Sequence, residues 1–399
     1  MTVRVNKSSF NIREKLSELE RPIGLKGSEL MRAETAQDAR DLVSAGRRNL
    51  VINGAMMINQ RYGTSSATVT DAYVLDRFKF KENHGGAASI NRDAFPVSDN
   101  HPAGFRYAMQ VACSTADTSL TSNEHSVIMH MVEGYNIGGT KFGTTNAENM
   151  TLSFWVKTNA PGTYSVALKN SAQNRCQIKE YTVGISGYVW EKVVLTFSGC
   201  TDGTWDDGDG IGMKLEFGLA GGQASYATSD LNKWKTSNLF LSTNQRNFFD
   251  STNNRFFISG IQLEIGNNAT DFEHRPYGEE LALCQRYYWE IGSYVTNNWA
   301  PVMLMVGNNA TRAFGVMHTP VTMRAHPQVT FSQLNLYDGS SSITVTDLFR
   351  YSQTGRNQEY DGLAFEANVA SGGTAGKAYR LNIENVSGTS GYIRLNAEL

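Results

Sequence analysis

The densest group of reactive side-chain types lies in residues 272–292, which read FEHRPYGEELALCQRYYWEIG. His274 and Cys284 could act as a base and a nucleophile, but they stand ten residues apart and carry none of the local signatures of the cysteine hydrolases. Cys284 falls with Leu281 and Tyr288 on one face of a predicted helix, where a cysteine is typically inert packing. We therefore interpret the segment as a structural joint rather than an active site.

A cluster of carboxylates stands in the segment TWDDGDG at residues 204–210. Its members Asp206, Asp207 and Asp209 carry the oxygen ligands that Ca²⁺ takes in proteins. The spacing is not that of an EF-hand, because the twelfth position counted from Asp207 is Gly218 rather than glutamate. The pattern favours a polar turn between strands, with a Ca²⁺ site as the alternative.

No other arrangement of catalytic or cofactor-binding residues is present in the sequence. The histidines form no HxH or HExxH pattern, and there is no P-loop or dinucleotide-binding fingerprint. We therefore predict a protein that is not an enzyme and has no catalytic residues. Apart from the Ca²⁺ alternative, we predict no cofactor.

Aromatic side chains are the remaining chemical resource, with 6 Trp, 17 Tyr and 19 Phe. Aromatic faces on a β-sandwich can stack on sugar rings, although most aromatic residues must fill the cores. Trp205, Tyr226 and Trp234 lie in loop-rich segments instead of strands. These three are the predicted glycan-binding platform.

The elements that would position these residues are mainly β. The chain has 37 glycines and only 8 prolines, and from Asn49 onward short apolar runs alternate with turn residues. This pattern predicts a β-sandwich over 49–276, most simply a jelly roll, and a second β-sandwich over 292–399. A helical pattern over 277–291 predicts a short helix that joins them.

Residues 1–48 have a different pattern, with two short stretches of helical spacing that offer each other little apolar surface. We predict a helical N-terminal arm that becomes ordered only against a partner. The apolar residues expected to anchor it are Ile12, Leu16, Leu19, Leu25, Leu30 and Leu42.

Charge and hydropathy exclude several classes of partner. The formal net charge of −2 argues against non-specific attraction to nucleic acid. No apolar run approaches the roughly 18 residues of a membrane span, and the first residues lack the apolar stretch of a secretory signal. The four cysteines form no CxxC pair, which favours free buried thiols in a reducing compartment. We therefore expect assembly in a cytoplasm without membrane insertion.

Several stretches resemble the carbohydrate-binding-module-like jelly roll of tailed-phage fibre and appendage proteins. These are NLVINGAMMINQRYGT, YVLDRFKF, MTLSFWVKTNAPGTYSVALKN, GIGMKLEFGL and FISGIQLEIGNNATDFEHRPYGEELALCQRYYWE, and together they span roughly residues 49–290. The N-terminal FNIREKLSELERPIGLKGSELMRAETAQDAR resembles the leading arm of virion proteins from phages of marine bacteria and cyanobacteria.

The resemblance implies a non-enzymatic virion protein, commonly a homotrimer, that attaches to phage tail, neck or capsid proteins through residues 1–48. Its β-domains would then be displayed outward for contact with host-surface glycan. Two alternatives stay open. One is a purely architectural decoration or collar fibre that binds no receptor. The other is a polysaccharide depolymerase, which would need paired carboxylates at glycosidase separation.

Overall fold

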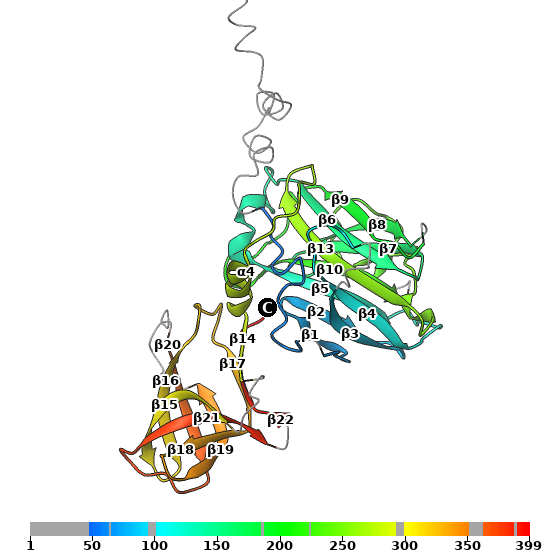
Figure 1. Ribbon diagram of the computed structural model, residues 1–399. Coiled ribbons are helices and arrows are strands. Elements are labelled where there is room, and N and C mark those ends of the chain that lie inside the picture. The colour runs from blue at the N-terminus through cyan, green and yellow to red at the C-terminus, as the bar shows by residue number, and fades with distance from the viewer. Residues whose placement is uncertain are drawn as a thin grey trace, which may run out of the picture.

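The computed structural model describes residues 48–63, 65–94, 101–184, 187–222, 225–292, 299–350, 362–386 and 389–399. It confirms the mainly β fold class with β-sandwich units (Figure 1). Residues 1–47 of the predicted N-terminal arm, with all six anchoring residues, lie outside the described residues. None of the helices in the described ranges is long and apolar enough to span a membrane.

The first unit is a sandwich of two antiparallel sheets (Figure 1). The six-stranded sheet has the order β1-β2-β5-β10-β7-β8, with bounds β1 Asp71–Leu75, β2 Phe78–Glu82, β5 His125–Glu133, β7 Gly162–Lys169, β8 Cys176–Val183 and β10 Ile211–Gly221. The five-stranded sheet has the order β3-β4-β13-β6-β9, with bounds β3 Ala87–Ala94, β4 Tyr107–Thr115, β6 Met150–Thr158, β9 Glu191–Phe197 and β13 Arg255–Ile265. Their inner faces share one core, in which Phe154 from one sheet meets Phe217 from the other.

Shorter elements decorate this sandwich. They are the 3₁₀ helices η1 Gly134–Asn136, η2 Gly138–Thr140 and η3 Phe248–Asp250, and the parallel pair β11 Ala227–Thr228 and β12 Leu241–Ser242. All nine residues of β5 are buried, so this strand is covered on both faces of its sheet. The inner face packs in the core, and the outer face lies against the segment that carries β11 and β12.

The second unit is a sheet that closes on itself. Its order is β15-β16-β20-β19-β18-β21-β22, and β15 also pairs with β21. The bounds are β15 Trp299–Asn309, β16 Arg312–His318, β18 Leu334–Tyr337, β19 Ser342–Arg350, β20 Gly362–Val369, β21 Ala378–Val386 and β22 Thr389–Ser390. Closure removes the open edges of the main strands, and alternate residues such as Phe365 and Leu381 fill the interior.

A joint connects the two units and contains a helix and a short strand. Helix α4 spans Tyr277–Gln285 and therefore ends earlier than the predicted 277–291. The next residues form β14, Tyr288–Ile291, in a three-stranded sheet of order β14-β23-β17, with β17 at Gln328–Ser332 and β23 at Tyr392–Asn396. Aromatic and β-branched residues in β14 find a ladder partner in the last strand of the chain, so the helix does not continue.

Several charged side chains are buried in this joint. The guanidinium of Arg77 stacks 3.6 Å from the ring centroid of Tyr287, and that of Arg61 stacks 3.6 Å from the ring centroid of Tyr288. Glu398 accepts hydrogen bonds from both arginines. The C-terminal end of the chain thus lies between the units (Figure 1) and is fixed to the first sandwich.

Candidate functional site

The outer face of the six-stranded sheet carries a pocket of about 300 Å³. Side chains directly opposite each other on antiparallel strands share a face, and the strand register therefore decides what lines it. Met129 on β5 pairs with Lys79 on one side and with Glu216 on the other. Because Met129 lies outside the core, the alternate charged residues of β2 and β10 also point outward into the pocket.

One wall of the pocket is aromatic. Tyr226 and Phe240 stack with their ring centroids 4.9 Å apart and their planes at 29°. The imidazole of His125 meets both rings edge-on, at centroid distances of 5.0 and 5.2 Å. Burial lowers the pKa of His125 below its ordinary value, so the imidazole is neutral at pH 7. Phe240 and His125 are each 5% exposed, so the half-buried Tyr226 is the ring that the wall presents to the pocket, and the wall adds no charge.

The wall belongs to the segment after β10, and glycines let that segment approach the sheet. A Cβ at Gly221 would lie 2.0 Å from a terminal methyl of Leu241, so only glycine fits without a shift of that side chain. The Gln245 amide then fastens the segment, because its oxygen accepts from the Ser165 N–H at 2.9 Å and its nitrogen donates to the Gly218 carbonyl at 3.2 Å.

Polar groups make the floor of the pocket. The Lys169 ammonium lies 3.1 Å from Glu216 Oε2 and donates to Asn238 Oδ1 at 2.6 Å. It also lies 4.9 Å from the centroid of Phe240, within cation–π range. Lys214 stands directly opposite Lys169 on the neighbouring strand. Burial and the neighbouring lysines lower the pKa of Lys214, and Glu216 partly offsets this effect.

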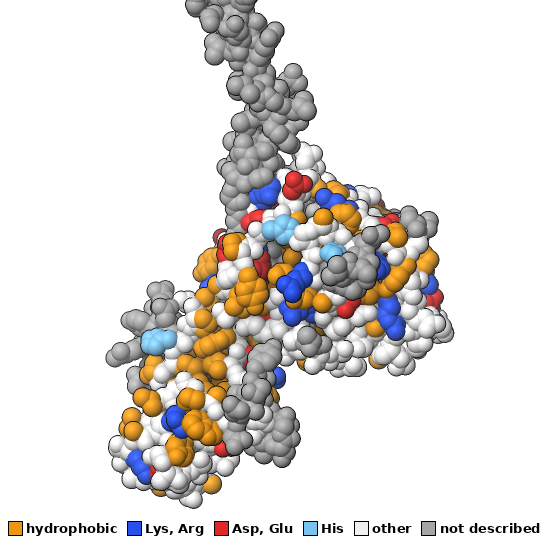
Figure 2. Space-filling view, in the orientation of Figure 1, with side chains coloured by type: hydrophobic (Ala, Val, Ile, Leu, Met, Phe, Trp, Pro, Cys, Tyr) orange, Lys and Arg blue, Asp and Glu red, His pale blue; other side chains and the backbone are white. Residues whose placement is uncertain are grey.

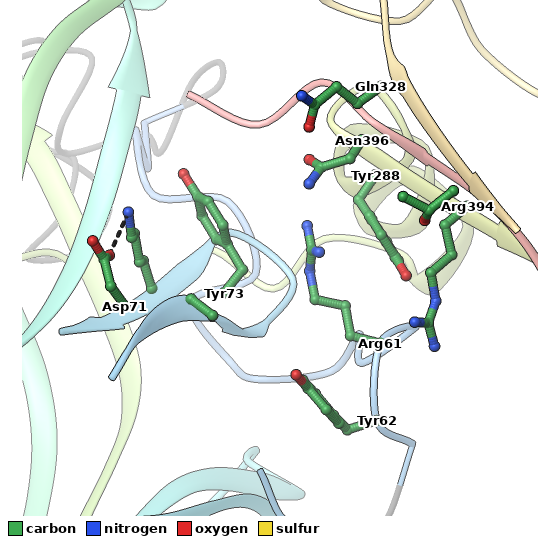
Figure 3. Close-up of a pocket in the computed structure, with 11 residues that line it drawn as sticks. Arg61, Tyr62, Asp71, Tyr73, Tyr288, Gln328, Arg394 and Asn396 are labelled. Carbon is green, nitrogen blue, oxygen red and sulfur yellow. Dashed lines mark ion pairs between the residues drawn. The ribbon is translucent and has the colours of Figure 1, made fainter. Parts of the chain in front are cut away.

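A second pocket of about 330 Å³ lies at the joint and is lined by the first sandwich and by the three-stranded sheet (Figure 3). Arg61 lies between Tyr73 and Tyr288. Gln328, Asn396 and Arg394 line the same pocket from the three-stranded sheet. Asp71 and Lys79 line this pocket as well as the one on the sheet. The two pockets are therefore neighbours that share one rim.

Of the three predicted platform residues, the structure places Tyr226 in the sheet pocket and the two tryptophans elsewhere. Trp205 and Trp234 meet edge-to-face, 5.6 Å apart, and both pack against Phe142 at the border of the core. Each indole N–H donates to a backbone carbonyl, that of Asp202 or Ser198. This pair therefore holds its loops together, and the structure does not bring it to Tyr226.

The predicted acidic cluster is a turn before β10. Asp206 Oδ1 accepts from the Gly208 N–H at 2.8 Å, and the carbonyl of Asp209 accepts from Arg324 at 2.6 Å. Within the described ranges, no three His, Cys, Asp or Glu side chains are grouped to hold a metal ion. The Ca²⁺ alternative for Asp206, Asp207 and Asp209 stays a prediction.

The rejected nucleophile and base lie in structural surroundings. Cys284 is fully buried in α4, and burial raises the pKa of its thiol well above the ordinary value. The thiol is therefore protonated and unreactive at neutral pH. His274 packs at a tilt against Phe105 and edge-to-face against Phe272.

Sequence reasoning missed Phe240 and the charged residues of the pocket. A signal for the charges was available in the strands FKFKE and GMKLEFGL, where lysine and glutamate alternate with core residues. Period-two alternation puts those charges on the face away from the core. Which of them meet across the sheet depends on the register, and no single strand encodes it.

No family model matches the chain, and no curated protein matches it either. Similar solved structures include the enzymatically active domain of tailspike protein 4 from bacteriophage CBA120, at 9% identity and a TM-score of 0.30, covering 54% of this chain and 21% of that chain. TmCBM61 in complex with beta-1,4-galactotriose has 11% identity and a TM-score of 0.28, covering 55% and 99%. The family 11 carbohydrate-binding module of Lic26A-Cel5E from Clostridium thermocellum has 12% identity and a TM-score of 0.26, covering 53% and 99%. Likeness at this level carries no functional inference.

Proposed function

We propose that this chain is a non-enzymatic phage virion protein, a tail, neck or head fibre that contacts host-surface glycan through the sheet pocket. The observation that carries the glycan part is the pairing of an aromatic wall, Tyr226 and Phe240, with a hydrogen-bonding floor made by Lys169, Glu216 and Asn238. Sugars present apolar ring faces and many hydroxyls, and such a pocket meets both.

The virion part of the proposal is supported by the sequence resemblance and by the construction of the joint. A displayed fibre must keep its domains at a fixed angle, and the buried Arg77–Glu398 contact restrains them across the joint. Attachment through residues 1–48 is part of the same proposal.

Assembly as a homotrimer is supported by an apolar strip on β15 and β16. Leu304, Val306 and Val316 are 75%, 53% and 59% exposed. Val306 pairs directly with Phe314, two residues before Val316, so these side chains share the outer face of the closed sheet. Hydrophobic side chains also gather on the visible face of this unit and over the joint (Figure 2). Copies of the chain that pack on the strip would remove it from water.

The test is binding of the labelled full-length protein to a panel of marine bacteria and cyanobacteria, with inhibition of adsorption of the parent phage as the second readout. We expect saturable binding that Tyr226→Ala abolishes. Tyr135→Ala is the matched control, because Tyr135 is 67% exposed and lies outside the pocket.

Three other outcomes would change the proposal. Absence of binding by a folded, oligomeric protein would favour the architectural decoration fibre. Binding that survives Tyr226→Ala would move the contact away from the sheet pocket. Release of reducing sugar from envelope polysaccharide would make the protein a depolymerase.

A further inference from the structure

The sheet pocket and the joint pocket form one continuous surface. Both are lined by Asp71 and Lys79, whose ion pair of 2.6 Å is the dashed line in Figure 3. An extended ligand that lies on the aromatic wall can therefore continue past this pair to Arg61. The joined surface can contact a longer ligand than either pocket alone, which suits a polymer.

The charge of this surface differs from that of the whole chain. Only Asp71 and Glu216 contribute acidic side chains to the lining of the two pockets. The cationic side chains that line them are Arg61, Lys79, Lys81, Lys169, Lys214 and Arg394. Four of these cations have carboxylate partners, and the pairs are Arg61–Glu398, Lys79–Asp71, Lys169–Glu216 and Arg394–Glu290. The chain as a whole has a formal net charge of −2, so the positive excess that remains at Lys81 and Lys214 is local. A local field of this sign attracts anions.

Lys214 is the cation in this lining that is best placed to meet an anionic group. Its residue exposure is 9%, and the carboxylate nearest to it in the sheet, Glu216, is bonded to Lys169. Within the described part of the chain, the Lys214 ammonium has no hydrogen-bond acceptor or ion-pair partner. The side chain is largely buried, so a bound anion would offset part of the cost of holding its charge there.

Arg61 is the second cation that could meet an acidic group. Glu398 holds its Nη2 at 2.9 Å, and the rings of Tyr73 and Tyr288 fix the guanidinium plane. Among the described residues, its buried Nε has no hydrogen-bond partner. A planar guanidinium held in this way suits a carboxylate, sulfate or phosphate group. Gln328 and Asn396 add neutral amides that can bond sugar hydroxyls.

We propose that the two pockets together bind an anionic polysaccharide, with sugar rings on the aromatic wall and acidic groups at Lys214 and Arg61. This rests on the proposed glycan contact and names its ligand class. Ionic groups of the ligand would be partly desolvated in the pockets, so binding weakens as salt screens the attraction.

The test is calorimetric titration of the full-length protein with oligogalacturonate and with its fully methyl-esterified, neutral form. A sulfated dextran and a ribitol-phosphate polymer are parallel arms that identify the preferred anion. We expect the best anionic ligand to bind at least about tenfold more tightly than the neutral one, because a single well-placed charge contact commonly contributes a factor of this size.

Variants assign the effect to the pockets. Lys214→Met should weaken anionic binding about tenfold or more, Lys214→Arg should restore most of it, and Lys192→Met is the matched control on an exposed position of β9. If Lys214→Met does not fold, Lys81→Met at the half-buried rim replaces it.

The proposal is overturned by equal affinity for acidic and neutral forms, by unchanged binding in a folded Lys214→Met variant, or by equally tight binding of a single-stranded DNA oligonucleotide. Neutral saccharide binding that depends on Tyr226 would leave the proposed function standing while it overturns the anionic preference. Absence of any Tyr226-dependent saccharide binding would overturn both.

Discussion

Removal of the Glu398 charge should loosen the joint between the two units. Arg77 is 0% exposed and Glu398 4% exposed, and the same carboxylate also accepts from Arg61 at 2.9 Å. Glu398→Gln keeps the shape of the side chain but leaves a buried guanidinium without its counter-charge. We therefore expect a loss far larger than an exposed ion pair would give.

The size of the loss in free energy of unfolding depends on the contacts that Arg77 keeps in the variant. Loss of one partner of a buried pair costs about 3–5 kcal/mol, because the other charge stays desolvated. Arg77 still donates to the Met131 carbonyl at 2.5 Å and still stacks on Tyr287. These contacts place the expected loss at the lower end, about 3 kcal/mol.

The assay is urea unfolding followed by fluorescence, together with hydrogen exchange of the amides in β14 and β23. The matched control is Glu148→Gln, which removes an exposed ion pair with Lys141 and should change stability by less than about 1 kcal/mol. Arg77→Met combined with Glu398→Leu should lose less than Glu398→Gln, because the fully buried Arg77 charge is removed together with its partner and only Arg61, whose side chain is 11% exposed, loses a contact. A shift for Glu398→Gln no larger than that of the control would refute this account of the joint.

Three further outcomes are expected. Burial raises the pKa of Glu82 from 4.5 to about 7, so the folded state favours the protonated acid. The free energy of unfolding therefore falls as pH rises from about 4.5 through 7. Glu82→Gln should remove that dependence and raise the free energy of unfolding by up to about 3 kcal/mol at pH 8, measured by thermal unfolding across pH. Val316→Lys should reduce the mass found by light scattering from trimer to monomer, whereas Thr346→Lys on an exposed position of β19 should not. Gly54→Ala would place a Cβ 2.1 Å from the Ile261 carbonyl oxygen, and should lower stability by about 2 kcal/mol in urea unfolding.

The sequence alone determined the elements and much of their orientation. Alternation in FKFKE and GMKLEFGL separates core residues from outward charges, because successive side chains of a strand point to opposite faces. The helical spacing of residues 277–291 predicted a helix, which in the structure ends at Gln285. These are local properties, and each can be read from a single segment of the sequence.

The tertiary structure decided everything that depends on which segments meet. The pairing of β23 with β14 brings Glu398 to Arg61 and Arg77, hundreds of residues away along the chain. Register sets Lys214 opposite Lys169, and the fold of the segment after β10 brings Phe240 over them. Strand pairing over long sequence separation depends on the packing of the whole chain, because each strand taken alone is compatible with many partners and registers.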